Sequence, residues 1–309
     1  MAGRVLNFGS LNLDYVYQVD HFVKPGETIS AKSQSVNAGG KGLNQSCALA
    51  RAGASVFHAG CFGKGGELLV NLLRDDGVDT SFILPANVFQ GNAVIQVDPT
   101  GENCILLYGG SNQCITEEQI GETLIGFGRN DVLLLQNEIN NLPRIVDKAY
   151  DRGMTIVLNP SPYDDGLLDV DFGKLSWLLV NEVEMEQISG TDQPETAWKR
   201  IRESYPNLSL LITLGKQGSI AFRAENGQLE IAEQRAFPVK ALDTTAAGDT
   251  YTGYFVATLM EQKPLVECMK LATAASAISV TRPGAAPSIP GREEVERFLK
   301  ESERAAEEG

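Results

Sequence analysis

Apolar runs alternate with amphipathic segments along most of the chain. Several of these runs are continuously hydrophobic and end in Asn, Gly or Glu, as in 131–138 (DVLLLQNE), 155–162 (TIVLNPSP), 177–184 (WLLVNEVE) and 210–218 (LLITLGKQG). Segments with helical spacing lie between them, for example 141–153 and 195–205. Continuously apolar strands bounded by helices are typical of βαβ units. The pattern predicts an α/β fold with helices on both faces of a mostly parallel central sheet.

A second group of predicted strands lies in the first third of the chain. A run at 4–14 (RVLNFGSLNLD) predicts one buried strand, and β-branched and aromatic residues predict four more at 15–20, 28–36, 92–99 and 103–110. The last two flank a hairpin-turn sequence, DPTGE. These strands predict a small sheet that stands off the main body. We assign residues 14–36 and 91–108 to it, and residues 1–13, 37–90 and 109–309 to the main α/β domain.

Composition narrows the partners and the chemistry. The chain has 309 residues and a formal charge of −14, which argues against nucleic acid or an anionic membrane as the main partner. No apolar run approaches the roughly 20 residues that span a bilayer. The five cysteines form no CxxC pair, which indicates reduced thiols and a cytoplasmic location. Because the chain has only two histidines, acid–base chemistry is expected to use carboxylates.

Residues 37–46 (NAGGKGLNQS) place glycines on both sides of Lys41. The stretch does not match the P-loop pattern, because Gly42 follows Lys41 where Ser or Thr is required, and it does not match GxGxxG. What remains is a glycine turn before a predicted helix, where a ligand can approach the backbone closely. Asn44 in this helix can donate and accept hydrogen bonds. Such a turn suits a polyol as well as a phosphate, and a turn without any ligand fits the local sequence equally well.

A second stretch of small residues, 241–255 (ALDTTAAGDTYTGYF), carries more specific chemistry. Ala246, Ala247 and Gly248 lead into a predicted helix, and consecutive N–H groups at a helix N-terminus form an anion site. Asp249 follows at once, where a carboxylate can take a proton from an attacking hydroxyl. Taken alone, an Asp in the first turn of a helix is also explained by its favourable interaction with the helix dipole.

These two stretches, in this order, make the chain resemble the ribokinase family of sugar kinases, the PfkB group. The first family signature is matched by Gly39, Gly40, Gly42, Asn44, Ser46, Gly53 and Gly63, and the second by Asp243, Thr244, Ala246, Ala247, Gly248, Asp249 and Gly253. Further matches run from 9–14 (GSLNLD) to 281–295 (TRPGAAPSIPGREEV), so the resemblance covers essentially the whole chain. It implies the family's three-layer α/β/α domain, with the small sheet as a lid over the sugar.

The resemblance also implies a role for each matched residue. Asp249 would be the catalytic base, and Ala246, Ala247 and Gly248 would form the anion hole for the phosphates. The sugar would be bound by Asp14, Gly40, Lys41, Asn44, Glu138 and Asp249. The nucleotide and its Mg²⁺ would be bound by Asn181, Glu184, Thr213, Gly215, Gly218, Gly248 and Thr273. A K⁺ ion would be ringed, mostly through backbone carbonyls, by Asp243, Thr245, Ser279, Arg282, Gly284 and Ser288.

Two positions depart from the family pattern. Tyr254 stands where the second signature prefers a small residue, which would alter helix packing beneath the phosphates. Segment 61–69 (CFGKGGELL) is short and lacks the acidic residue that commonly follows its first glycine. The second departure affects the expected sugar-side loop and leaves the expectation for Asp249 unchanged.

The resemblance implies transfer of the γ-phosphoryl group of MgATP to the 5-hydroxyl of D-ribose, by a homodimer that pairs through its lids. Two alternatives remain open. The first is another kinase of the group, acting on fructose, a ketodeoxy sugar acid or a nucleoside, which would differ in the lid and the sugar loop. The second is a non-catalytic sugar-binding sensor, against which the intact Ala246–Asp249 stretch argues.

Overall fold

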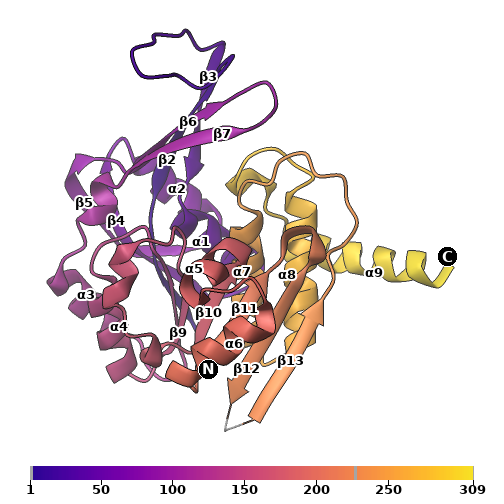
Figure 1. Cartoon of the computed structure of the whole chain (residues 1–309). Helices are drawn as coiled ribbons and strands as arrows, with labels where there is room; N and C mark the ends of the chain where they lie inside the picture. Colours follow the sequence, from indigo (N-terminus) through magenta and orange to yellow (C-terminus); the bar gives the residue numbers. More distant parts are fainter. Residues whose placement is uncertain (1–2, 226–227, 309) are drawn as a thin grey trace.

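Two β-sheets of unequal size organise the chain (Figure 1). The computed structural model describes residues 3–225 and 228–308. The large sheet forms the body of the molecule, and the small one projects from it (Figure 1). The predicted α/β class is therefore confirmed, together with its mostly parallel central sheet.

The large sheet has nine strands, and all neighbouring pairs are parallel except at one edge. At that edge β12 and β13 run antiparallel, with β12 paired to β11. In order across the sheet the strands are β13 (Gln228–Gln234), β12 (Ser219–Glu225), β11 (Ser209–Thr213), β10 (Trp177–Asn181), β9 (Thr155–Asn159), β8 (Val132–Gln136), β1 (Val5–Phe8), β4 (Val56–Lys64) and β5 (Asp79–Phe89).

Helices cover both faces of this sheet, because successive strand residues alternate between two separate cores. Val5 and Leu134 belong to one core, whereas Leu6 and Leu133 belong to the other. The first core packs against α1 (Lys41–Arg51), α2 (Glu67–Asp75), α7 (Ala247–Met260), α8 (Leu265–Ser279) and α9 (Arg292–Glu308). The second packs against α3 (Glu117–Leu124), α4 (Leu142–Asp151), α5 (Glu182–Ser189) and α6 (Pro194–Ser204). Short 3₁₀ helices occupy Gly110–Gln113, Asp165–Asp169, Phe172–Lys174, Gly215–Gln217 and Ala286–Ser288.

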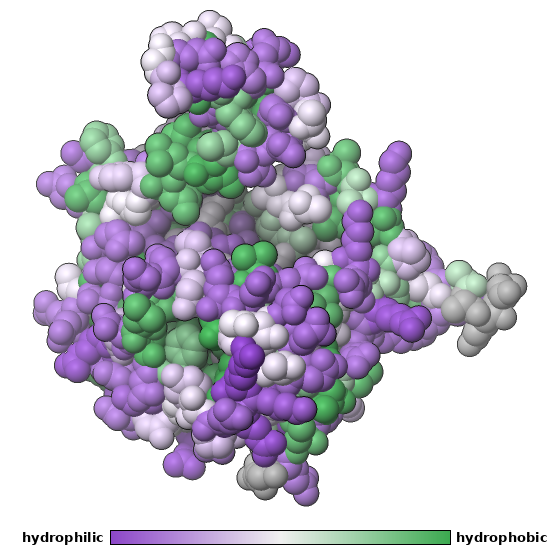
Figure 2. Space-filling model, in the orientation of Figure 1, coloured by the Kyte–Doolittle hydropathy of each residue, from purple (hydrophilic) through white to green (hydrophobic). Residues whose placement is uncertain are grey.

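The small sheet has four strands in the order β3 (Ser33–Gly39), β2 (Asn12–Gln18), β6 (Asn92–Val97) and β7 (Asn103–Tyr108). The predicted hairpin joins β6 to β7, and the strands predicted at 92–99 and 103–110 are confirmed. The strand predicted at 28–36 was wrong in its first half, because β3 begins at Ser33. Hydrophobic side chains gather on the projecting sheet in Figure 2, and Ile105, Leu106 and Tyr108 of β7 are exposed.

The single strand predicted across 4–14 was also wrong, because the run divides between the two sheets. β1 ends at Phe8 in the large sheet and β2 begins at Asn12 in the small one. The break follows from close packing against α1, since a Cβ on Gly9 would lie 2.6 Å from Gly42 Cα. Ser10 in the break accepts hydrogen bonds from the backbone of α1, with Leu43 N 3.0 Å from the Ser10 carbonyl oxygen.

Two further expectations concern the cysteines and membrane-spanning segments. The five cysteine thiols are free. Within residues 3–225 and 228–308, every helix is too short or too polar to cross a bilayer.

Candidate active site

The polar residues that follow the parallel strands meet the N-termini of α1 and α7 at the carboxyl ends of these strands, as expected for an open α/β sheet. They surround a cavity of about 260 Å³. Its walls include eight of the residues expected from the sequence: Lys41, Asn181, Glu184, Thr213, Ala246, Ala247, Gly248 and Asp249. In Figure 2 the surface is hollowed between the projecting sheet and the main body.

The N-terminus of α7 is shaped for an anion. Ala246 precedes the helix in the left-handed conformation, with φ of 58°, and the helix begins at Ala247. Ala247 N–H already donates to the Thr244 carbonyl over 3.2 Å. By their position in the first helical turn, the N–H groups of Gly248 and Asp249 lack an intrahelical acceptor. A Cβ placed on Gly248 would meet nothing within 4 Å, so this turn opens into the cavity.

Asp249 is held by two side-chain amides from α1. Asn44 Nδ2 lies 3.0 Å from one carboxylate oxygen, and Gln45 Nε2 lies 2.9 Å from the other. Asp249 is only 7% exposed, so these contacts fix the direction of its carboxyl group within the cavity. Asn44 Oδ1 is buried and has no hydrogen-bond partner among the described residues, which leaves one acceptor beside Asp249.

The expected sugar-side residues converge beneath the small sheet. Glu138 follows β8 and accepts hydrogen bonds from the Ser10 hydroxyl and from Lys41 N, the latter over 3.0 Å. Asp14 in β2 lies against Gly39, where an added Cβ would be 2.0 Å from its carboxylate oxygen. Gly40 has φ of 95°, a left-handed conformation that favours glycine. The two matched glycines therefore let the Asp14 carboxylate and the start of α1 approach each other.

Three carboxylates and one ammonium group share this small volume. Burial and repulsion by Glu138 and Asp249 raise the pKa of Asp14 to about 7. Burial raises the pKa of Glu138, although Lys41 and Ser10 oppose the shift. For Lys41, burial alone would lower the pKa, but attraction to Asp249, Glu138 and Glu184 outweighs it and raises the pKa. The cluster therefore keeps Lys41 charged and favours the protonated form of Asp14.

A second cavity of about 510 Å³ adjoins the first, and the two share Thr213, Thr244, Ala247 and Gly248 as walls. The predicted nucleotide residues Gly215, Gly218 and Thr273 line this second cavity. Apolar side chains, including Phe237, Val239 and Val280, supply much of the rest. A polar cavity at a helix N-terminus that opens into an apolar one can accommodate phosphates at one end and a base at the other.

Asn181 and Glu184 form the N-terminal capping box of α5. Asn181 Oδ1 accepts from Glu184 N over 2.9 Å, and Glu184 Oε2 accepts from Asn181 N over 3.1 Å. The other Glu184 oxygen accepts from the Ser161 hydroxyl. Within the described residues there is no cluster of three or more acidic, His or Cys side chains that could hold a metal ion. The donor set fits Mg²⁺ held through water and phosphate oxygens, the usual arrangement for this ion.

The expected cation residues lie where two loops meet behind α7. Asp243 Oδ1 accepts from Thr245 N over 2.9 Å and from its hydroxyl, while Oδ2 accepts from Gly284 N over 2.8 Å. Burial alone would raise the pKa of Asp243, but these hydrogen bonds outweigh that effect and lower the pKa. The Arg282 guanidinium pairs with Glu294, which leaves only its backbone for an ion. Asp243 joins the two loops, so carbonyl ligation of a monovalent cation fits the arrangement.

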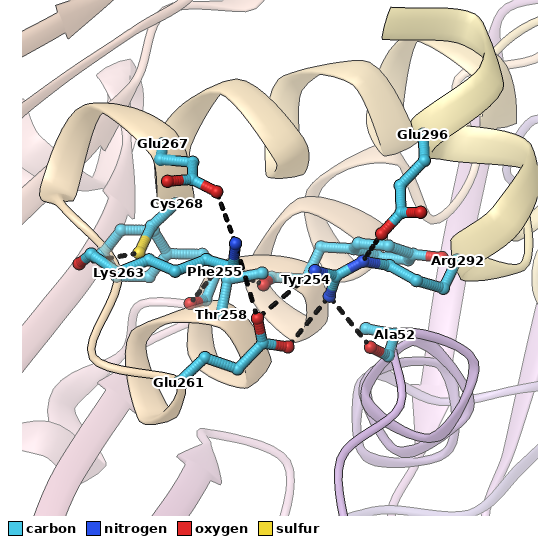
Figure 3. Close-up of polar contacts among 10 residues, drawn as sticks. All are labelled: Ala52, Tyr254, Phe255, Thr258, Glu261, Lys263, Glu267, Cys268, Arg292 and Glu296. Atoms are coloured by element: carbon cyan, nitrogen blue, oxygen red, sulfur yellow. Dashed lines mark hydrogen bonds and ion pairs between the residues drawn. The ribbon is translucent and has the colours of Figure 1, made fainter.

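Of the two departures from the family pattern, Tyr254 has an unexpected place. The sequence predicted a change in packing beneath the phosphates, but Tyr254 lines neither cavity. The side chain is fully buried on the far side of α7 and donates a hydrogen bond to the Pro290 carbonyl over 2.8 Å. Nearby, Arg292 joins the start of α9 to Glu261, Glu296 and the Ala52 carbonyl (Figure 3). Tyr254 therefore stabilises the segment between the cation loop and α9.

The second departure from the family pattern is segment 61–69. In this segment β4 continues to Lys64 and α2 begins at Glu67.

Several site residues were missed from the sequence. Gln45 contacts Asp249 directly, and Asn159 and Ser161 line the same cavity. Asn159 and Ser161 belong to the matched stretch LNPSP but received no role. Gln45 directly follows Asn44 in the first signature. Two adjacent polar residues in one buried helical turn could have indicated that Gln45 also belongs to the site.

The fold and the site together define a sugar kinase. The family model described as pfkB family carbohydrate kinase matches residues 2–292, and the chain belongs to this family. It is 36% identical to a ribokinase of Haemophilus influenzae, over 94% of this chain and 97% of the relative. A ribokinase structure from Cryptococcus neoformans, in complex with ADP, has a TM-score of 0.82 and 32% identity, covering 96% of this chain and 99% of that one. An Arabidopsis thaliana ribokinase complexed with ribose and ATP has a TM-score of 0.84 and 29% identity, covering 97% and 99%.

We expect Asp14→Asn to raise the melting temperature of the ligand-free protein at pH 8. The pKa of Asp14 rises from its ordinary 3.8 to about 7 on folding, so the folded state binds more protons than the unfolded state between these values. The ionised carboxylate therefore destabilises the fold increasingly as pH rises through this window, and fully above it. The gain at pH 8 should shrink toward zero as the pH approaches 4, while KM for the sugar rises.

Asp20→Asn is the matched control for this prediction. Asp20 lies just beyond the same strand but is exposed, and the hydrogen bond to Lys32 lowers its pKa. This control should give no gain in melting temperature. A pH-independent effect of Asp14→Asn on the melting temperature, or a loss at pH 8, would contradict the raised pKa of Asp14.

Proposed function

We propose that this protein transfers the γ-phosphoryl group of MgATP to the 5-hydroxyl of D-ribose, giving D-ribose 5-phosphate and ADP. The observation that carries the proposal is the position of Asp249. Its carboxylate lies at the N-terminus of α7, lines the first of the two connected cavities and is close to the buried carboxylates of Asp14 and Glu138. The similarity to ribokinases, one of them complexed with ribose and ATP, supports ribose as the acceptor.

In this proposal, Asp249 takes the proton of the acceptor hydroxyl as its oxygen bonds to the γ-phosphorus. The bond from that phosphorus to the β,γ-bridging oxygen breaks, and ADP leaves. Charge that builds on the phosphates is stabilised by the first-turn N–H groups of α7, which are already oriented before the reaction. Lys41 stays protonated among its carboxylate neighbours and adds a positive charge near the transferred group.

The remaining sugar hydroxyls would be bound by Asp14, Asn44 and Glu138, with the backbone at Gly40 and Lys41 close to the ring. The unpartnered Asn44 Oδ1 supports such a contact, since it can accept from a hydroxyl. A bound Mg²⁺ would neutralise charge on the phosphates, and Asn181 and Glu184 would hold it through water. Thr213, Gly215, Gly218 and Thr273 would line the nucleoside site.

The small sheet would act as a lid that excludes water from the transferred phosphoryl group. Its exposed apolar strand β7 supports pairing with the lid of a second copy, because an unpaired apolar edge invites association. We therefore propose a homodimer through the residues 14–36 and 91–108, in a cytoplasmic enzyme. A molecular mass in solution twice that of the chain would support this pairing, and a monomer would contradict it.

Related kinases that act on fructose, a ketodeoxy sugar acid or a nucleoside share the proposed chemistry and differ in the acceptor. The expected sugar-side residues are carboxylates with one lysine, which suits neutral hydroxyls. A panel of these acceptors, with ADP release as the readout, separates the candidates. Ribose should give the highest kcat/KM, and a clear preference for another acceptor would overturn the ribose assignment.

Asp249→Asn is expected to lower kcat by roughly 10²- to 10⁴-fold, because the amide cannot accept the hydroxyl proton. ATP binding should stay close to that of the unchanged protein, since the first-turn N–H groups remain in place. Steady-state kinetics and calorimetric titration with an ATP analogue measure the two quantities. Near-normal turnover in this variant would show that another group acts as the base.

Potassium is expected to activate the enzyme more than sodium. Carbonyl groups of the loops at 243–245 and 279–288 would hold the ion directly behind the N-terminus of α7, and both loops are joined by Asp243. Initial rates in KCl and NaCl at the same ionic strength test this expectation. Asp243→Asn should weaken the preference for potassium, whereas equal rates in the two salts would refute the cation site.

A further inference from the structure

A connected set of neutral side-chain amides lies behind Asp249, and the phosphoryl-transfer scheme above does not use it. Gln45 Nε2 donates to Asp249 Oδ1 over 2.9 Å and also to Asn159 Oδ1 over 3.0 Å. Both N–H bonds of this amide are therefore engaged, one of them on the carboxylate. Gln45 is fully buried, so water does not compete for these contacts.

The direction of the Gln45 amide is fixed by its neighbours. Gln136 Nε2 donates to Gln45 Oε1 over 2.6 Å, which makes that atom the acceptor and turns the NH₂ group toward Asp249. Asn159 has its own direction set, because its Nδ2 donates to the Leu179 carbonyl over 3.0 Å. If the Gln45 amide were flipped, its oxygen would face the Asn159 oxygen and the Asp249 carboxylate, and its NH₂ group would face the Gln136 NH₂ group. The hydrogen bonds to all three residues would be lost.

Gln136 is anchored in turn to the centre of the sheet. Its Nε2 also donates to Asn7 Oδ1 over 3.0 Å, and Asn7 Nδ2 donates to Gly42 O and Ser46 Oγ, both over 2.8 Å. Gln136 Oε1 is buried without a partner among the described residues and lies against Gly9. The side chain thus uses both of its N–H bonds on this network, which indicates that it serves to orient other groups.

The network ends at His58, which lies 2.8 Å from Ser46 Oγ through Nδ1 and 3.2 Å from the Gly9 carbonyl through Nε2. Complete burial lowers the pKa of His58 to about 4, so the ring is neutral at physiological pH. Every member of the network between His58 and Asp249 is therefore uncharged. It cannot neutralise the carboxylate as a lysine would, and it acts only through the direction of its hydrogen bonds.

We propose that Gln45, oriented by Gln136, is a positioning residue that holds the Asp249 carboxylate aimed at the acceptor hydroxyl. Asn44 and Gln45 each place one N–H on a different carboxylate oxygen, so the group cannot rotate without losing both contacts. Each oxygen keeps further acceptor capacity for a substrate hydroxyl. This inference rests on the proposed function, since it assigns a role toward the proposed base.

The charged groups that face Asp249 within the described residues define the background for a pH test. Lys41 at the start of α1 attracts the carboxylate, whereas Asp14 in β2 and Glu138 after β8 repel it. These groups are common to the unchanged protein and to every variant below. A difference in pH dependence between them therefore reports on the amide that was replaced.

Gln45→Met keeps the length of the side chain but removes both N–H donors. At saturating sugar and ATP, kcat should fall by about 10- to 100-fold because the base is no longer aimed. The acid limb of the kcat–pH profile should move to higher pH, because the lost N–H donor had stabilised negative charge on the carboxylate. KM for ATP should stay within about twofold, since the residue does not line the nucleotide cavity.

Two variants separate positioning from general loss of structure. Gln136→Met leaves Gln45 in place but removes the donor that orients it, so the acid limb should move in the same direction by a smaller amount. Gln119→Met is the matched control, because Gln119 is also buried but donates to the Gly60 and Phe82 carbonyls away from the site. It should lower the melting temperature without moving the acid limb.

Asp249→Asn, measured alongside, separates the two levels of the proposal. A folded Gln45→Met variant with the unchanged kcat and acid limb, beside an inactive Asp249→Asn, would overturn the positioning role alone. Turnover at the unchanged rate in Asp249→Asn would overturn the base and the positioning role together. If Gln45→Met does not fold, the acid limb of Gln136→Met decides: a shift supports the proposal and no shift overturns it.

Discussion

The close contact between α1 and α7 is the constraint on which the rest of the site depends. Gly253 makes the contact possible, because a Cβ there would lie 2.4 Å from Ala48 Cβ and 2.9 Å from Leu49 N. At this separation Asn44 and Gln45 of α1 reach Asp249 of α7, although about 200 residues lie between them in the sequence. A larger residue at position 253 would push the helices apart and separate the carboxylate from both amides. The two glycine-rich stretches of the sequence therefore work as one unit.

Burial of charge is the second constraint, and it follows from the first. The contact holds Lys41, Asp14, Glu138 and Asp249 in a volume where few waters can solvate them, so their charges act strongly on one another. One ammonium group among three carboxylates leaves an excess of negative charge, and burial together with that excess raises the pKa of Asp14. A site of this kind is costly for stability in the empty protein. In the proposed function, sugar hydroxyls would add hydrogen-bond donors to these carboxylates, which links affinity for a polyol to the instability of the empty site.

The hydrophobic pattern was sufficient for the fold class because continuously apolar strands buried on both faces differ clearly from amphipathic helices. It failed where backbone contact between distant segments decided the outcome. Gly9 divides the run 4–14 between two sheets because α1 packs on it, and no local signal marks that contact. For the site, the residue types around Asp249 suggested the chemistry, and the family resemblance supplied the roles. Gln45 was missed because its function depends on which oxygen of which amide it faces, and that depends on the register of α1 against β8 and α7.

For Tyr254, the sequence predicted an effect at the wrong place. Its size at a position that prefers small residues predicted an effect beneath the phosphates, yet the side chain points toward Pro290 at the other side of the helix. Sequence spacing gave the helix, but the neighbour that accepts the hydroxyl group comes from a segment 36 residues away.

In the proposed reaction, Asp249 and the anion site of α7 act together on the 5-hydroxyl of ribose. The most direct measurement is phosphorus–proton correlation NMR of the product formed from ribose, ATP and magnesium. A single ribose-dependent ester is expected, with its phosphorus coupled to the two protons on C5. A phosphate on the anomeric or another ring carbon, or ATP consumption that does not depend on ribose, would contradict it.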